Sequence, residues 1–473
     1  MSMKPAMPMP KLSTDKMTAS IRRLRLARFH IMRGTKVAGG AACAYARPLG
    51  FGFSQRCAEA GSTRRNLLIS QPRSDLYQPV MLMALKPQRA LLALAGLYVL
   101  YLAGGLVLAS QAVIDRVYFF PGYSIKRPMP DESGFSPDGP VVQNLSGGVA
   151  LSRRIVPGNL GSVVRIDTLR SASDSLTCFV QETGLAFRFP RHAFPAAEPA
   201  EYPAPARMLV VSDIEGNFKG LQQLLQGAGV VDAQARWRFG AGHLVFVGDM
   251  FDRGLQVTEC LWLLYKLEHE AAQAGGKVHF ILGNHEVMNL TGHYKYLRRK
   301  YRHNADSLGL DYARWYAPDT ELGRWLRSKN VVERIGPTLF VHGGLSPEVA
   351  ALRLPLVQLN ALTRRSLDAS QHAAPRPAEQ LVRNPKLSPD WYRGIAQEEA
   401  PAAHVAAVLR QYGATRMVIA HTPVEEITPL YNGQVVAIDL PHQEHTKQGF
   451  GQALWVEGGR FSVVDNLGRK QAL

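Results

Sequence analysis

Beyond residue 205 the chain alternates between short apolar runs and segments whose apolar residues recur at helical spacing. The runs at 208–212 (MLVVS) and 243–248 (HLVFVG) have the length and β-branched content of buried strands. Between them, apolar residues from Phe218 to Leu225 recur every three or four positions, as in an amphipathic helix. Further runs of the strand type follow at 278–283, 338–341, 417–420, 435–439, 453–457 and 461–465. Alternating strands and helices predict an α/β fold over this part of the chain.

An uninterrupted apolar run from Ala90 to Ala109 comes before this part and follows Lys86 and Arg89. Its length is close to the roughly 20 residues that a helix needs to cross a bilayer, and it lacks the polar face of a soluble core helix. Basic residues before the run favour a cytoplasmic N-terminus. We therefore expect a membrane anchor within 86–112, with the rest of the chain on the periplasmic side. A cleaved signal peptide, which would leave a secreted or periplasmic protein, is the alternative.

Two segments of different composition lie between the apolar run and the α/β part. Residues 139–189 contain short apolar runs at 163–166, 178–181 and 185–189, split by Gly and Ser, and these predict a small β-rich region. Residues 190–205 contain five prolines, a density that favours an extended linker. The α/β domain is then expected to occupy 206–470.

Basic charge is concentrated at the N-terminus of the chain. Residues 1–80 carry 14 Lys and Arg against three acidic residues, so only +6 of the net charge of +17 falls on the other 393 residues. A nucleic-acid partner is therefore not expected for the folded part. The leader shows no lasting hydrophobic periodicity; we expect it to be disordered or to lie upstream of the true start, and an organelle transit peptide has a similar composition. Four scattered cysteines predict neither a zinc knuckle nor a disulfide framework.

Five of the predicted strands end in a side chain that can bind a metal ion. These side chains are Asp213, Asp249, Asn284, His342 and His421. Ligands of open α/β sheets bind outside the carboxyl ends of the strands, so we expect the five side chains to converge on one crevice. Carboxylate, amide and imidazole groups are typical ligands of divalent metals. The pattern therefore predicts a metal site.

The sequences around these residues resemble the ordered motifs of the calcineurin-like metallophosphoesterases. The matching segments are Asp213-Ile214-Glu215-Gly216-Asn217, Gly248-Asp249-Met250-Phe251-Asp252-Arg253-Gly254, Gly283-Asn284-His285-Glu286, Val341-His342-Gly343-Gly344 and His421-Thr422. Within that family the resemblance is to the Shewanella-like phosphoprotein phosphatases, through 320–330 (TELGRWLRSKN) and 391–394 (WYRG). It spans about residues 206–470 and implies a two-sheet αββα sandwich, preceded here by the transmembrane helix and the β-rich segment.

The resemblance implies two divalent metal ions. Asp213, Glu215 and Asp249 would hold the first ion, and Asp249, Asn284, His342 and His421 the second. The Asp249 carboxylate would then bridge two cations about 3.5–4 Å apart, and a hydroxide formed between them would attack the phosphorus atom.

Four further residues of the matching motifs would act on the phosphoryl group. Arg253 would clamp it, Arg393 would be a second clamp, His285 would be the general acid, and Asp252 would orient His285 and keep it protonated. Plainer interpretations are a salt bridge within a turn for Asp252 and Arg253, a helix-start cap for His285 and a surface charge for Arg393.

Two positions depart from the family pattern. Ala420 stands where a glycine commonly precedes the last histidine, which is a milder change, and Glu215 stands where the family usually has histidine. A carboxylate adds negative charge and is a harder donor than imidazole. Manganese is therefore the expected metal, with iron, magnesium and zinc as alternatives.

Three functions follow from these interpretations. The resemblance favours hydrolysis of phosphomonoesters, with phosphorylated protein side chains as the substrate class. A location outside the cytoplasm favours instead a phosphatase or phosphodiesterase for small phosphorylated metabolites or nucleotides. An inactive binding or scaffold relative is the third, and it is disfavoured because the acid, the clamp and the metal ligands are retained together.

Overall fold

The structure is a computed structural model that describes residues 87–110, 116–119, 123–126, 136–159, 161–171, 173–368 and 376–473. The predictions for the basic leader, residues 1–80, lie outside these ranges.

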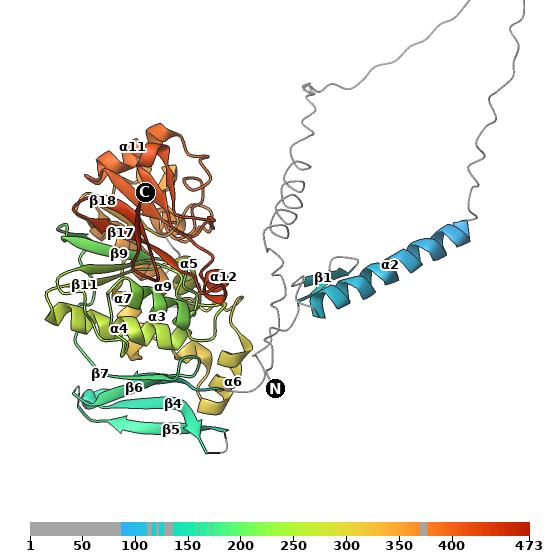
Figure 1. Cartoon of the computed structure of the whole chain (residues 1–473), viewed down its shortest axis with the longest axis horizontal. Coiled ribbons are helices and arrows are strands. Elements are labelled where there is room, and N and C mark those ends of the chain that lie inside the picture. Colours follow the sequence, from blue (N-terminus) through green and yellow to red (C-terminus); the bar gives the residue numbers. More distant parts are fainter. Residues whose placement is uncertain are drawn as a thin grey trace, which may run out of the picture. The chain divides into compact units, whose positions relative to one another are not determined.

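Two six-stranded sheets form the centre of the fold, as the alternating pattern and the family resemblance predict (Figure 1). The first sheet has the order β11 (Lys277–Ile281), β10 (His243–Val247), β9 (Arg207–Val211), β17 (Gln452–Glu457), β18 (Arg460–Asp465) and β19 (Lys470–Ala472). The second has the order β15 (Thr428–Leu430), β16 (Val435–Ala437), β14 (Arg416–Ile419), β13 (Thr338–Val341), β12 (Val332–Ile335) and β8 (Glu201–Tyr202). Strands β9, β10 and β11 are parallel to one another, as are β13, β14 and β16. Their carboxyl ends can therefore build one site.

Apolar residues on both faces of these strands explain why each sheet is buried on both sides. Val210 and Val245 of the first sheet and Phe340 and Val418 of the second belong to one core cluster. The alternate residues, such as Leu209, pack with helices in a second, larger cluster. Because side chains of a strand alternate between its faces, continuous apolar runs are what a strand buried on both faces requires.

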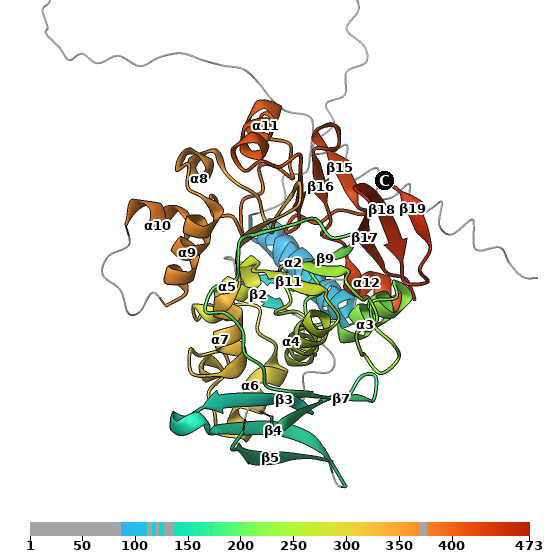
Figure 2. The same cartoon turned by 90° about the vertical axis from the view of Figure 1, so that its left-hand side faces the viewer.

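Helices cover the outer faces of both sheets (Figure 2). The larger core cluster contains residues of α3 (Phe218–Gly227), α4 (Val257–Gln273), α9 (Leu356–Leu367) and α11 (Ala402–Gln411). The remaining helices of this part are α5 (Asn284–Leu290), α6 (Arg299–Leu308), α7 (Glu321–Ser328), α8 (Pro347–Ala351), α10 (Pro377–Leu381) and α12 (His442–Lys447). The helix expected from Phe218 to Gly227 is thus present as α3.

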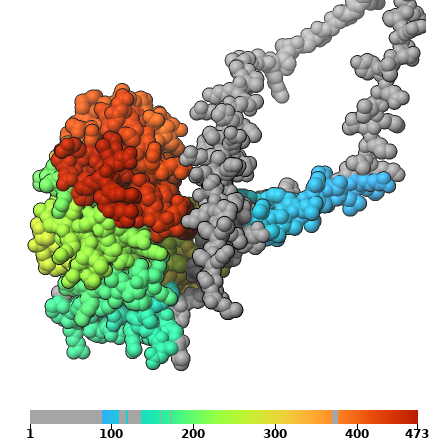
Figure 3. Space-filling model, in the orientation of Figure 1, coloured from blue at the N-terminus to red at the C-terminus, as the bar shows by residue number. Residues whose placement is uncertain are grey.

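The β-rich region packs directly on the α/β domain. Its strands are β3 (Asp138–Asn144), β4 (Ala150–Gly158), β5 (Gly161–Leu169), β6 (Ser175–Val180) and β7 (Leu185–Pro190). The ring of Phe189 lies 5.0 Å from that of Trp262 in α4, and the Trp262 indole donates to the Pro140 carbonyl. In Figure 3 the teal surface of this region continues into the green surface of the domain. The three strand-like runs of this region fall in β5, β6 and β7.

The segment 190–205, expected to be an extended linker, packs against the domain instead. Its strand β8 joins the second sheet beside β12. The buried carboxylate of Glu198 accepts hydrogen bonds from Lys277 at 3.1 Å and from Lys329 at 3.2 Å. Prolines keep the backbone extended, but these contacts fix the segment in place.

Helix α2 (Pro87–Ser110) contains the predicted membrane-spanning run. Its 18-residue window Leu91–Leu108 has a mean hydropathy of 2.2, and only 6% of the window is buried. Length and composition therefore suit a membrane span, although a signal sequence meets the same criteria. Two short strands follow, β1 (Arg116–Phe119) and β2 (Tyr123–Lys126), which pair antiparallel. The anchor, its orientation and the periplasmic location stay predictions.

Candidate metal centre and active site

The five strand-end side chains lie in loops that both sheets contribute. Asp213, Asp249 and Asn284 follow β9, β10 and β11, whereas His342 and His421 follow β13 and β14. Positive φ values of 50°, 59° and 66° occur at Asp213, Asp249 and His421. A positive φ is unfavourable for residues other than glycine and persists only where the surrounding structure fixes it. Such residues cluster at functional sites.

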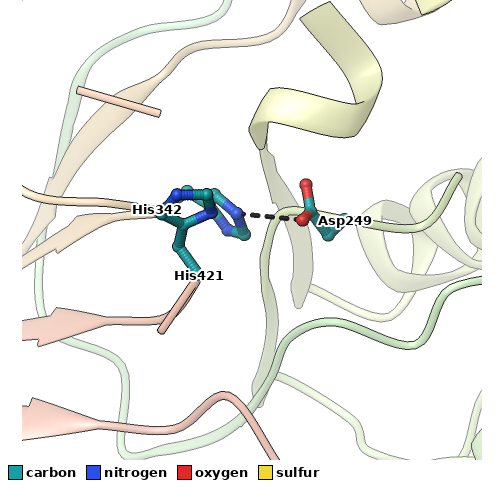
Figure 4. Close-up of side chains that lie close together, drawn as sticks. All are labelled: Asp249, His342 and His421. Atoms are coloured by element: carbon teal, nitrogen blue, oxygen red, sulfur yellow. Dashed lines mark ion pairs between the residues drawn. The ribbon is translucent and has the colours of Figure 1, made fainter. Parts of the chain in front are cut away.

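Asp249 lies at the centre of this arrangement. Asp249, His342 and His421 offer ligand atoms within 4.8 Å of one another, and so do Glu215, Asp249 and His285. The side chains of both donor groups are buried. Figure 4 shows His342 and His421 facing Asp249 from the opposite sheet. A carboxylate that belongs to two groups of donors is what a bridge between two metal ions requires.

The hydrogen bonds of His342 determine which nitrogen faces the site. Its Nδ1 lies 2.6 Å from the carbonyl oxygen of Val247, which can only accept, so Nδ1 carries a proton. Its Nε2 lies 3.2 Å from Asp249 Oδ2 and 3.1 Å from Asn284 Oδ1. Burial lowers the pKa of His342, but Asp249 outweighs it and raises the pKa to about 10. A cation, either a proton or a metal ion, must therefore lie among these three atoms.

Several buried polar atoms near Asp249 have no hydrogen-bond partner, and two of them belong to predicted metal ligands at the ends of strands. These two are Asp213 Oδ2 and His421 Nε2. Burial raises the pKa of Asp213 well above its usual value, and burial together with His342 lowers that of His421. Unpaired buried groups need a compensating partner, and divalent cations bound beside Asp249 would supply one to each. The donor set thus fits a metal ion.

Glu215 approaches the site from the loop that follows β9. Its backbone N–H donates to the carbonyl of Asp249 at 3.0 Å, and its carboxylate forms an ion pair with Arg253. Burial raises the pKa of Glu215 to about 8, despite the opposing effect of Arg253. In this position Glu215 can act as a metal ligand or as the counter-ion of Arg253.

His285 has the environment of a protonated imidazole. Its Nδ1 lies 2.6 Å from Asp252 Oδ2, and Asn289 donates to the same oxygen at 3.1 Å. Burial opposes protonation, but Asp249 and the hydrogen bond to Asp252 raise the pKa of His285 to about 9. Because Nδ1 donates to Asp252, the second proton is on Nε2, which lies 3.7 Å from Asp249 Oδ2. A general acid for a leaving group bound beside Asp249 would have this geometry.

The two arginines predicted as phosphate clamps lie at the edge of the same group of residues. Arg253 is paired with Glu215, and 54% of its side chain is exposed. Arg393 Nη1 donates to the carbonyl of His421 at 2.7 Å and to Thr422 Oγ1 at 3.2 Å. Arg393 therefore supports the His421 turn, and a role for either arginine on substrate remains a prediction.

Sequence reasoning missed two buried carboxylates. Glu286 accepts backbone hydrogen bonds from Asp249 at 2.8 Å, Met250 at 2.7 Å and Gly283 at 2.8 Å, which join the loops after β10 and β11. Burial and Asp249 raise the pKa of Glu286, and these N–H groups oppose the shift. Asp439 follows β16, and burial, together with Asp249, raises its pKa to about 6. Asp439 ends the run 435–439, so the strand-end rule could have found it.

Comparison with known proteins is consistent with this geometry. Residues 206–425 match the calcineurin-like phosphoesterase family. Shewanella-like protein phosphatase 2 of Arabidopsis thaliana is 25% identical over 305 residues, covering 53% of this chain and 75% of that protein. Shewanella-like protein phosphatase 1 of Plasmodium berghei is 26% identical over 257 residues, covering 51% of this chain and 69% of the relative. A Schizosaccharomyces pombe protein is 32% identical over 247 residues, covering 50% of this chain and 73% of that protein.

Among solved structures, the cold-active protein-tyrosine phosphatase of a psychrophilic Shewanella species is similar, with 29% identity and a TM-score of 0.64. The match covers 99% of that protein and 72% of this chain. Residues 206–470 make up a smaller share of this chain than the matched part does. The shared structure therefore extends beyond the segment that carries the motifs. With the motifs, the fold and these relatives in agreement, the chain belongs to the calcineurin-like phosphoesterase family and is related to its Shewanella-like protein phosphatases.

Proposed function

We propose that the chain is a metal-dependent phosphatase that hydrolyses phosphomonoesters at a centre of two divalent ions. The position of Asp249 between Glu215 on one side and His342 with His421 on the other carries this proposal. The proposed ligands are Asp213, Glu215 and Asp249 for one ion and Asp249, Asn284, His342 and His421 for the other. When bound, such ions lower the pKa of a water molecule and polarise the phosphoryl group.

The other residues of the site then handle the proton and the negative charge. His285 Nε2 carries a proton that it can give to the leaving oxygen, and Asp252 fixes the ring through Nδ1. Arg253 can exchange its ion pair with Glu215 for the phosphate oxygens, and Arg393 lies next to the His421 turn. The carboxylate of Glu215 supports manganese as the metal, with iron, magnesium and zinc as alternatives.

We propose phosphorylated protein side chains as the substrate class. Support comes from the relatives, which are named as protein phosphatases. The apolar helix α2 supports the second candidate, small phosphorylated metabolites or nucleotides, because an anchored periplasmic domain would meet few phosphoproteins. Turnover of phosphotyrosine and phosphoserine peptides, compared with that of nucleotides, separates the two classes.

The decisive experiment uses the full chain and p-nitrophenyl phosphate with added manganese. Turnover that Asp249→Asn abolishes supports the phosphatase. Asp306 is exposed on α6 and belongs to neither donor group, so Asp306→Asn is the matched control and should leave turnover unchanged. No turnover with any divalent metal would support the inactive scaffold instead.

We further propose that α2 anchors the protein with residues after 110 in the periplasm. A reporter that is active only in the periplasm, fused after Leu473, tests this orientation. An inactive reporter on a stable fusion would reverse it.

A further inference from the structure

Strand β5 is the outer edge of the three-stranded sheet β3-β4-β5, and no strand within the described ranges pairs with its other side (Figure 2). From Val163 to Thr168 every side chain is exposed, on both faces of the strand. Ile166 is 59% exposed and Val163 is 38% exposed. The edge therefore combines unpaired backbone groups with exposed β-branched side chains.

Edge strands of natural proteins are normally protected against pairing with another chain. Protection comes from short length, proline, charged side chains (lysine above all) or a β-bulge. Strand β5 has nine residues, contains neither proline nor lysine, and pairs with β4 without interruption from Gly158↔Gly161 to Ala150↔Leu169. Its charged side chains, Arg165 and Asp167, have opposite signs, so a strand of complementary charge is not repelled. The catalytic site does not use this strand. A long edge without proline, lysine or a β-bulge, whose charges are balanced in sign, indicates an interface.

We infer that β5 pairs antiparallel with β5 of a second copy of this chain, around a two-fold axis at Ile166. In this register Ile166 faces Ile166 of the other copy, Val164 faces Thr168, and Arg165 faces Asp167. The charged pair and the Val–Thr pair each occur twice. Three β-branched residues of each copy, Val164, Ile166 and Thr168, then share one face, where such pairs stabilise a sheet.

The charges on the strand favour this register over its neighbours. In an antiparallel pair, two directly opposed residues either both direct their backbone N–H and C=O groups toward the other strand or both direct them away. A two-fold axis between two copies of one strand must therefore lie where a residue faces its own counterpart, not between two residues. An axis at Arg165 or at Asp167 would place two like charges opposite each other, which destabilises a sheet. Asp167 also pairs with Arg154 at 3.1 Å within its own sheet, and its second oxygen can accept from Arg165 of the other copy.

A second copy fits this edge better than an unrelated strand does. A two-fold interface uses the same surface on both partners and requires that surface to complement itself. The segment from Val164 to Thr168 meets this requirement in charge and in apolar content. The product is a continuous six-stranded sheet, in the order β3-β4-β5-β5-β4-β3.

Charge reversal tests the register. The full chain in detergent is studied by light scattering coupled to size-exclusion chromatography, and the wild type should be a dimer. Arg165→Asp places two carboxylates opposite each other, and Asp167→Arg places two guanidinium groups opposite each other. Each variant alone should raise the dissociation constant about tenfold or more, because two attractive pairs become repulsive. An equal mixture of the two variants restores both opposite-charge pairs, so it should form heterodimers.

Cysteine cross-linking provides a second test with a matched control. Directly opposed Cα atoms lie about 4.5–5.5 Å apart, within the range of a disulfide, so Ile166→Cys should cross-link to itself under mild oxidation. Thr168→Cys would be offset from its own counterpart by about 13 Å along the strand and should not. Circular dichroism of both variants checks that each is folded before the cross-linking is compared.

Three results would overturn the inference. They are a wild type that stays monomeric at all concentrations, a dimer that neither charge reversal weakens, and equal cross-linking of the two cysteine variants. If the wild type is monomeric, the partner of the β5 edge would have to be a strand of a different protein. A dimer insensitive to charge would assign association to another surface.

Discussion

The carboxylate of Glu286 gives the sharpest test of how the site is held together. Its side chain is fully buried, and it accepts N–H groups from two loops. Oε2 accepts from Asp249 and Gly283 at 2.8 Å each, and Oε1 accepts from Met250 at 2.7 Å and Phe251 at 3.3 Å. Replacement of Glu286 by glutamine keeps the shape but converts one acceptor into a donor.

The cost of Glu286→Gln follows from these contacts. Whichever oxygen becomes the amide nitrogen, two buried backbone N–H groups lose their acceptor. Each such group costs about 1–3 kcal/mol, so the free energy of unfolding should fall by about 2–6 kcal/mol. Because Asp249 sits on one of the two loops, metal affinity should also fall, by about 10–100-fold as for other groups that orient ligands.

Urea unfolding of the full chain in detergent, followed by tryptophan fluorescence with a chelator present, measures the stability change without the metal. Glu444 is exposed on α12, so Glu444→Gln is the matched control and should change stability by less than about 0.5 kcal/mol. A loss below about 1 kcal/mol for Glu286→Gln would refute the argument that this carboxylate holds the two loops.

Three other predictions concern the acid, the metal preference and pH. His285→Ala should lower turnover by about 10²–10⁴-fold with metal content retained; loss of both would make His285 a ligand instead. Glu215→His should shift metal preference toward zinc, measured by metal analysis, and an unchanged profile would exclude residue 215 as a ligand. Burial and His279 lower the pKa of His243 to about 4, below its ordinary 6.5. Because the unfolded chain takes up a proton at this histidine more readily, the free energy of unfolding is highest above pH 6.5 and falls as the pH is lowered toward 4. The variant His243→Gln should lose this fall between pH 6.5 and 4 in urea unfolding. A pH dependence equal to that of the wild type would show that His243 does not cause it.

The strand-end rule worked because it depends on topology that the sequence records directly. Apolar runs followed by Asp, Asn or His placed Asp249, His342 and His421 at one end of the fold before any contact was known. Glu215 and His285 needed the family resemblance, since neither ends a strand. Asp439 meets the same rule and was overlooked within the run 435–439.

Features that depend on distant contacts could not be predicted in this way. The role of Glu286 rests on N–H groups up to 37 positions away in the chain. The segment 190–205 has the proline content of a free linker, yet Glu198 is buried because Lys277 and Lys329 arrive from remote parts of the fold. Composition records the local stiffness of a chain but not its partners.

The division of the donor atoms between the two sheets links metal occupancy to the mechanics of the whole sandwich. Asp249 is attached to one sheet, and His342 and His421 are attached to the other, so any ion that all three coordinate ties the layers together at one end. Sliding of one layer over the other would then require the ion to leave. Resistance to heat should consequently rise with free metal concentration, and removal of the metal should loosen both layers together rather than the loops alone.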